Sequence, residues 1–388
     1  MSENNRRHRG NSDRWLSRQK RLAIELLEKG RNESDNDLRR KFLLEAMRQG
    51  LRSEANDVAF QALSLAVLLN IGTGKVRELV GLMWPHLRDS ETLLAAARSA
   101  ENTHLLLWAA ERALYFVPEF PSIPLTELER VLTSWLDALA SNGGYRGRAM
   151  HRMRLHYALR MGHLQKATRM MKALETEEPE SQLVPSPGQL PGTEPQSRGG
   201  KAVDFGCRAY KNQVRVLYHC AMDDAQSAWR SARYLVEGRS ACDLSVCAMA
   251  PREALAALLE PLDRAGMRAE ADRAHTVGMP LLRGSAVSLG WVGHHVRYWV
   301  RRGKMSEARS VLENAPTLEE AAQCGAVTPF HRFHFLRAVL CLTRASGEPS
   351  RYGGPDALED QLRTIARAFD ARNGSPKFEA MLDARDEI

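Results

Sequence analysis

The feature that most constrains this chain is a frame that recurs along it: an Arg two residues before a Gly, and an Ala five residues after that Gly. The four copies are "RQGLRSEA" from 48, "RMGHLQKA" from 160, "RAGMRAEA" from 264 and "RRGKMSEA" from 301. Gly tolerates the left-handed backbone conformation that ends a helix, and the polar residues after it can begin the next helix. Each copy therefore predicts a helical hairpin, in which the small Ala lets two backbones approach closely.

The residues around each frame repeat with the period of an amphipathic helix. Apolar residues recur three to four apart after the turn, as at Met170, Met171 and Leu174, and before it, as in "MHRMRLHYALRMG". No long alternation of apolar and polar residues predicts a strand. The sequence therefore favours an all-α fold.

These units resemble degenerate tetratricopeptide repeats, which combine a turn Gly, an Ala five residues later and often a closing Pro, here Pro179 and Pro316. Gly266 and Gly303 are 37 residues apart, near that family's period of about 34. A fifth unit lacks the Gly and places Asp223 in the Gly role and Ala228 in the Ala role, and a weaker sixth begins at 104. The resemblance implies an α-solenoid, a right-handed superhelical array of antiparallel helix pairs with a concave groove.

Composition suggests how the chain is divided. Residues 1–21 hold seven Arg and Lys against two acids, a net charge of +5, and too few apolar residues to order themselves, whereas residues 178–203 are rich in Pro, Gly and Ser. The predicted parts are a disordered basic arm (1–21), an N-terminal helical-repeat block (22–177), a disordered linker or loop (178–203), a C-terminal helical-repeat block (204–345), and a capping helix with a tail (346–388).

Charge and cysteine content narrow the class of protein. The formal charge is +8, with 55 Lys and Arg against 47 Asp and Glu, so acidic partners are favoured only modestly. The longest apolar run, "ALSLAVLLNI" at 62–71, is about half the length of a membrane-spanning helix. Six Cys without paired CxxC spacing indicate reduced thiols. We expect a cytoplasmic protein that does not bind membranes.

The Arg of each frame forms what we call the Arg column: Arg48, Arg160, Arg264 and Arg301. Each lies in the last turn of a predicted first helix, and in the family that the chain resembles such helices line the groove. The resemblance thus implies that the column holds carboxylates or phosphates of a partner. The structural alternative is that a cation near a helix C-terminus is favourable by itself, by about 0.3 to 1 kcal/mol.

Upstream turns of the same faces complete the predicted partner-binding set. Arg297 lies one turn before Arg301, and His156 with Arg152 lie one and two turns before Arg160. The 264 unit instead places Glu260 and Glu253 on this face, so the predicted groove is mixed in charge. That argues against a uniform track for nucleic acid.

Catalytic and metal motifs are not evident in the sequence. "GTGKVRELVG" at 72 has Gly and Lys without the spacing that cradles phosphate, and no GxSxG or dinucleotide loop occurs. His331 and His334 have the spacing of helical metal ligands but lack the Glu of a zinc-protease motif. We expect no catalytic residues, no metal and no cofactor.

Three functions remain open at this point. The first is a non-enzymatic scaffold that binds a protein or peptide segment, possibly acidic, in a partly basic concave groove. The second is an RNA-binding helical-repeat protein, and nucleic acid could also contact the basic N-terminal arm. The third is an enzyme on a helical toroid with an acid/base pair of carboxylates that no motif reveals.

Overall fold

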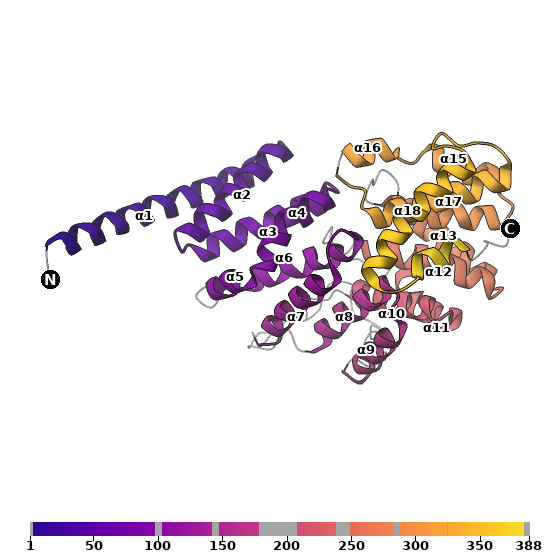
Figure 1. Cartoon of the computed structure of the whole chain (residues 1–388), viewed down its shortest axis with the longest axis horizontal. Helices are drawn as coiled ribbons and strands as arrows, with labels where there is room; N and C mark the ends of the chain where they lie inside the picture. Colours follow the sequence, from indigo (N-terminus) through magenta and orange to yellow (C-terminus); the bar gives the residue numbers. More distant parts are fainter. Residues whose placement is uncertain are drawn as a thin grey trace. The chain divides into compact units, whose positions relative to one another are not determined.

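The computed structural model confirms the all-α prediction. It describes residues 3–97, 103–141, 147–177, 208–237, 249–282, 288–323 and 325–383. These residues contain helices and turns but no strand, apart from an isolated bridge between Ser350 and Gly353 (Figure 1). The predicted linker, 178–203, lies outside the described residues.

The chain divides into two compact units. Unit 1 contains residues 1–73, 78–114 and 131–138, and unit 2 contains 74–77, 115–130 and 139–388. This division differs from the predicted boundary at 178–203, because the helices on either side of that segment pack together in unit 2. Composition marks a segment unsuited to a core, but which helices share a core depends on how their apolar faces pack.

Unit 1 is built mainly from the first helices of the chain: α1 (Glu3–Asn32), α2 (Asn36–Arg52), α3 (Asn56–Gly72), α4 (Val76–Arg88), α5 (Ser90–Ala97) and α6 (Thr103–Phe116). The segment predicted as a disordered arm is instead part of α1. Ala23 and Leu27 are buried, and α1 packs on α2. This packing supplies the costly helix nucleus, and the Arg, Lys and Gln upstream favour propagation.

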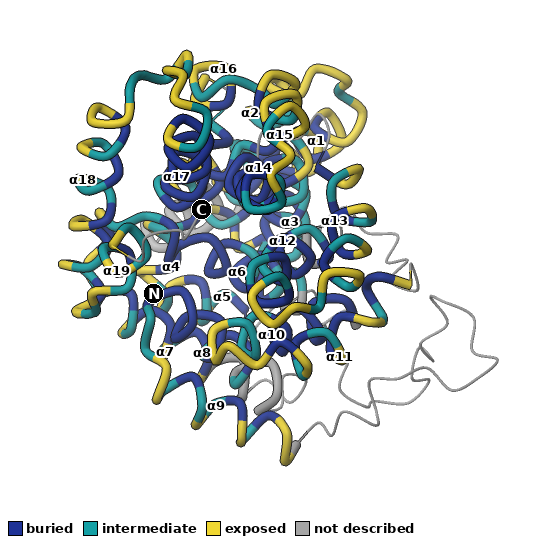
Figure 2. The backbone as a smooth tube through the Cα atoms, turned by 90° about the vertical axis from the view of Figure 1, so that its right-hand side faces the viewer, coloured by how far each residue is buried: buried dark blue, intermediate teal, exposed yellow. Residues whose placement is uncertain are grey.

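Unit 2 contains successive helical hairpins. Its elements are η1 (Val117–Glu119), α8 (Gly147–Met161), α9 (Leu164–Glu177), α10 (Arg208–Ala221), α11 (Ala225–Val236), α12 (Met249–Arg264), α13 (Arg268–Leu282), α14 (Leu289–Arg301), α15 (Met305–Glu313), α16 (Leu318–Gln323), α17 (Pro329–Ser346), α18 (Pro355–Asn373) and α19 (Lys377–Asp383), while α7 (Leu125–Ser141) contributes to both units. The helices α8, α10, α12, α14 and α17 each contact the next in this order. Figure 2 shows α14 and α17 as mostly buried.

The hairpin turns share one hydrogen-bond pattern. Gly162, Gly266 and Gly303 have φ of +80°, +73° and +69°. At Gly162 the next N–H, that of His163, donates to the Ala158 carbonyl at 2.8 Å, and equivalent bonds close the other two turns. These bonds define the Schellman motif, and the Ala five residues after each Gly is fully buried. The hairpins predicted at these three copies are confirmed.

The turn without glycine is also confirmed. Asp223 has φ +57°, the N–H of Asp224 donates to the His219 carbonyl at 2.9 Å, and Ala228 is fully buried. Asp is one of the few non-glycine residues that tolerate this conformation.

The frame predicted at 48 is wrong by four residues. Gly50 lies inside α2, and the left-handed residue is Glu54, with φ +56°. The buried Ala five residues later is Ala59, so the Arg in the equivalent position is Arg52 rather than Arg48. Gly50 is required for a different reason: a Cβ there would lie 2.9 Å from the Cβ of Ala59. Two local patterns overlap in this sequence, and the packing of α2 on α3 selects the second.

We expect Glu54→Gly to stabilise unit 1 by about 1 kcal/mol, because Gly removes the strain of a left-handed residue. Gly50→Ala should destabilise it by about 1 to 3 kcal/mol through overpacking against Ala59. Chemical denaturation of both variants checks the shifted register. If Glu54→Gly destabilised the protein and Gly50→Ala stabilised it, the turn would instead be at Gly50.

Candidate functional site: a buried charge network

A buried charge network in unit 2 is built around Arg160, in the last turn of α8. Its guanidinium lies 2.6 Å from the Glu253 carboxylate of α12 and 3.5 Å from that of Glu119 in η1. It also lies over the ring of Phe330, 4.0 Å from the centroid. All three charged side chains are buried. One cation thus holds two carboxylates from segments far apart in the sequence.

Glu253 has further partners on its other side. The Tyr115 hydroxyl and the Gln213 amide both donate to the Glu253 carboxylate, and the same amide lies 2.8 Å from the Tyr115 oxygen. The His156 ring stacks on Tyr115 at 4.4 Å between centroids. Burial lowers the pKa of His156 well below its usual value, so this ring is neutral at pH 7.

The charge of Glu119 is only partly compensated by its neighbours. Burial raises the pKa of Glu119 to about 7, although Arg160 and a hydrogen bond from Thr328 act in the opposite direction. Its Oε2 is 3.7 Å from Nε2 of His331, whose pKa burial lowers to about 3. Glu119 therefore titrates near neutral pH.

The C-terminal helices reach the same place. The Lys377 ammonium donates to the carbonyls of Leu159 and Arg160, at 2.6 and 3.3 Å, and so caps the end of α8. Burial, and then the charge of Arg160, lower the pKa of Lys377 to about 7. Arg372 donates to the carbonyls of Pro118, within η1, and of Phe120, which follows η1. The segment predicted as a cap of the last repeat therefore also packs on the first hairpin of unit 2.

Arginines farther along unit 2 form a second set of pairs, each with an acid of the preceding hairpin. Arg264 donates to Asp223 at 2.7 Å, Arg301 to Asp263 at 3.2 Å and Arg297 to Glu260 at 2.9 Å. The partners are separated by 41, 38 and 37 residues, close to one repeat. We call these the inter-hairpin pairs. Burial acts to raise the pKa of Glu260, but Arg297, Arg337 and Arg301 lower it to about 2.

The structure separates the seven predicted partner-binding residues into accessible and inaccessible groups. Arg152, His156, Arg160 and Arg297 are buried, and the Arg301 side chain is 12% exposed. Arg264 and Arg48 are 55% and 57% exposed, and Arg48 pairs within its own helix with Glu45. Arg48 belongs to unit 1 and the other six residues to unit 2, where Arg160 lies within the network and Arg264, Arg297 and Arg301 surround Glu260.

Sequence reasoning missed Glu119, Tyr115, Gln213 and Lys377. No motif marks these residues, because each comes from a different helix or turn. Glu253 and Glu260 did carry a signal, because both lie on the Arg face of their helix. Glu260 pairs with Arg297 one repeat later, whereas Glu253 pairs with Arg160, far earlier in the chain.

The pair His331 and His334, which has the spacing of metal ligands, consists of buried, packed side chains. His294 stacks on His334 with 5.0 Å between centroids, and a Cβ at Gly293 would lie 2.6 Å from the His334 carbonyl, so α14 and α17 approach closely. No group of three potential metal ligands occurs among the described residues. Cys220 and Cys341 are thiols, and the other four cysteines lie outside the described residues.

Comparison with protein-family models, curated proteins and solved structures gives no match. The tetratricopeptide resemblance therefore stays a prediction that rests on the repeated frame. Among the described helices, none is long and apolar enough to cross a membrane.

Proposed function

We propose that this protein is a non-enzymatic helical scaffold that binds a protein or peptide segment, built as a right-handed array of helix pairs like that of tetratricopeptide repeats. The observation that carries the proposal is the repetition in unit 2: hairpins with the same turn and the same buried Ala, joined by the inter-hairpin pairs. Repeat arrays of this kind provide extended surfaces for partners.

The contacts of the Arg column refine which residues could meet a partner. Arg160 already holds two carboxylates of its own chain, so it performs internally the task that the prediction gave to a partner. Arg264 and Arg48 keep exposed guanidiniums in weak surface pairs, from which a partner carboxylate can recruit them. We therefore place partner contacts on these two residues of the predicted set, of which Arg264 alone stands at the repeat position, since the turn at Glu54 puts Arg52 there in place of Arg48.

RNA binding is the second candidate, favoured by the formal charge of +8. The inter-hairpin pairs count against it, because the guanidiniums of Arg297 and Arg301 are little exposed and already neutralised by carboxylates, so they do not extend a phosphate track from Arg264. Salt dependence distinguishes the two: release of counterions from several phosphates gives a steep fall in affinity with salt, whereas one or two charge pairs give a shallow one.

The test is capture of partners by the immobilised full chain from nuclease-treated lysate, followed by measurement of affinity for the captured species. Arg264→Ala and Arg48→Ala should each weaken binding by about threefold to tenfold while leaving the melting temperature nearly unchanged. The control is Arg309→Ala, which removes an exposed Arg, paired with Glu348, outside the column. Equal binding by all three variants, or capture only of nuclease-sensitive material, would contradict the proposal.

A further inference from the structure

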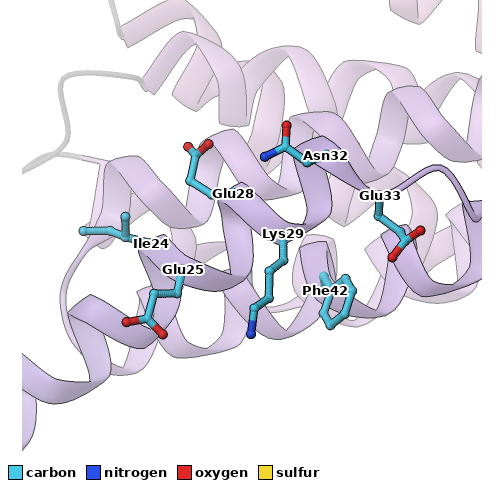
Figure 3. Close-up of a pocket in the computed structure, with 7 residues that line it drawn as sticks. All are labelled: Ile24, Glu25, Glu28, Lys29, Asn32, Glu33 and Phe42. Carbon is cyan, nitrogen blue, oxygen red and sulfur yellow. The ribbon is translucent and has the colours of Figure 1, made fainter.

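The hairpin of α1 and α2, in unit 1, carries a surface hollow that plays no part in the buried charge network of unit 2. An open hollow of about 720 Å³ lies on it, and its lining includes Ile24, Glu25, Glu28, Lys29, Glu33 and Phe42 (Figure 3). The lining combines three carboxylates and one ammonium with two apolar side chains, of which Ile24 is 42% exposed. A hollow of this kind fits an apolar or aromatic side chain flanked by positive charges.

Helix α1 also exposes an aromatic side chain with positive charges beside it, Trp15. The Trp15 side chain is 49% exposed, which is unusual for an indole, and Leu22, seven residues later, is 37% exposed on the same stripe of α1. Arg18 and Arg21 follow Trp15 closely and are exposed. Residues 1–21, which contain all these cations, carry a net charge of +5.

The lengths of the two helices explain why this group is uncovered. α1 has 30 residues and α2 has 17, and the chain reverses between them over Glu33 to Asp35. The second half of α1 therefore lies along α2, and the first half extends beyond it (Figure 1). One helix thus presents a basic aromatic segment at one end and an acidic hollow at the other.

We propose that two copies of this chain associate through antiparallel α1 helices, with Trp15 of each copy in the hollow of the other. An antiparallel arrangement that sets Trp15 beside the turn from Glu25 to Lys29 also sets Arg18 beside Glu25. It places the basic start of one helix along Glu28 and Glu33 of the other. A two-fold interface of this type contains two copies of the contact between Trp15 and the hollow, so both the basic aromatic segment and the acidic hollow of each copy are covered.

Charge complementarity selects a second copy as the occupant. Parallel association would set the basic segments side by side, with seven cations against two acids in each. The antiparallel arrangement replaces that repulsion with attraction between opposite charges and removes the indole from water. The inference does not depend on the proposed scaffold function, because it concerns residues of unit 1 alone.

The test is sedimentation equilibrium of the full chain over a wide range of concentration, at low and at physiological salt. We expect a concentration-dependent dimer whose dissociation constant rises with salt. Trp15→Ala should raise that constant by at least about tenfold, because buried aromatic residues dominate interfaces. The matched control is Leu38→Ala, which truncates another exposed apolar residue of the same hairpin and should change nothing.

A charge-swap experiment keeps the test decisive if one variant folds poorly. The variants Arg18→Glu/Arg21→Glu and Glu25→Lys/Glu28→Lys should each be monomeric, and their mixture should restore the dimer, because the mixed pair is complementary at both contacts. Circular dichroism confirms that each variant stays helical. The proposal is overturned by a wild-type chain that is monomeric at every concentration, by a dimer that Trp15→Ala leaves unchanged, or by a mixture that stays monomeric.

Discussion

Replacing Arg160 by Met should cost about 3 to 5 kcal/mol of unfolding free energy, the largest effect that we expect of any member of the Arg column. The substitution leaves the carboxylates of Glu119 and Glu253 buried without their cation, and it removes the guanidinium from the ring of Phe330. Chemical denaturation of the full chain measures the loss.

The repeat supplies matched controls for this experiment. Arg264→Met changes the equivalent position of a later hairpin, where the pair with Asp223 is solvent-exposed, and should cost less than about 1 kcal/mol. The double variant Arg160→Met/Glu253→Gln should recover part of the loss, because Gln removes one buried charge and can still accept the hydrogen bond from Tyr115. Equal, small losses at Arg160 and Arg264 would show that the buried network does not stabilise unit 2.

The second large effect is loss of stability in mild acid. Five histidines are buried among the described residues: His156, His275, His295, His331 and His334. Burial lowers the pKa of each, to about 4 for His275 and about 3 for His331. Below pH 6.5 the unfolded chain binds protons that the folded chain does not. The stability contribution is therefore complete above pH 6.5 and is lost as the pH falls toward 4, by about 1.4 kcal/mol per pH unit for each histidine.

Glu119 works in the opposite direction and provides the control. Because its folded pKa is raised to about 7, its contribution is present below pH 4.5 and is lost as the pH rises toward 7. One carboxyl opposes these five imidazoles and that of His294, whose pKa burial lowers to about 3, so we expect melting temperatures to fall steeply between pH 6.5 and 4.5. His334→Gln should make that fall shallower, because it removes about one proton from the uptake on unfolding, whereas Glu119→Gln should make it steeper. A melting temperature that is constant across this range would contradict the prediction.

The sequence determined the local architecture because the interactions that form a hairpin turn span five or six residues. Gly162, Gly266 and Gly303 each end a helix with the same hydrogen bonds, and the Asp223 turn was predictable although it lacks glycine. The same locality explains the error at Gly50. Two candidate turns four residues apart are both compatible with the sequence, and contact between α2 and α3 decides between them.

The tertiary structure decided what the repeated arginines do. In the inter-hairpin pairs the acidic partners lie 37 to 41 residues away, Glu253 is farther still from Arg160, and no local pattern specifies such distances. Whether a guanidinium is exposed, as at Arg264, or buried, as at Arg160, depends on which other segments pack over its helix end. At Arg160 those segments are η1 and the C-terminal helices, which approach from opposite ends of unit 2 in the sequence. Turns follow from local sequence, whereas the burial and pairing of charge follow from packing between distant segments.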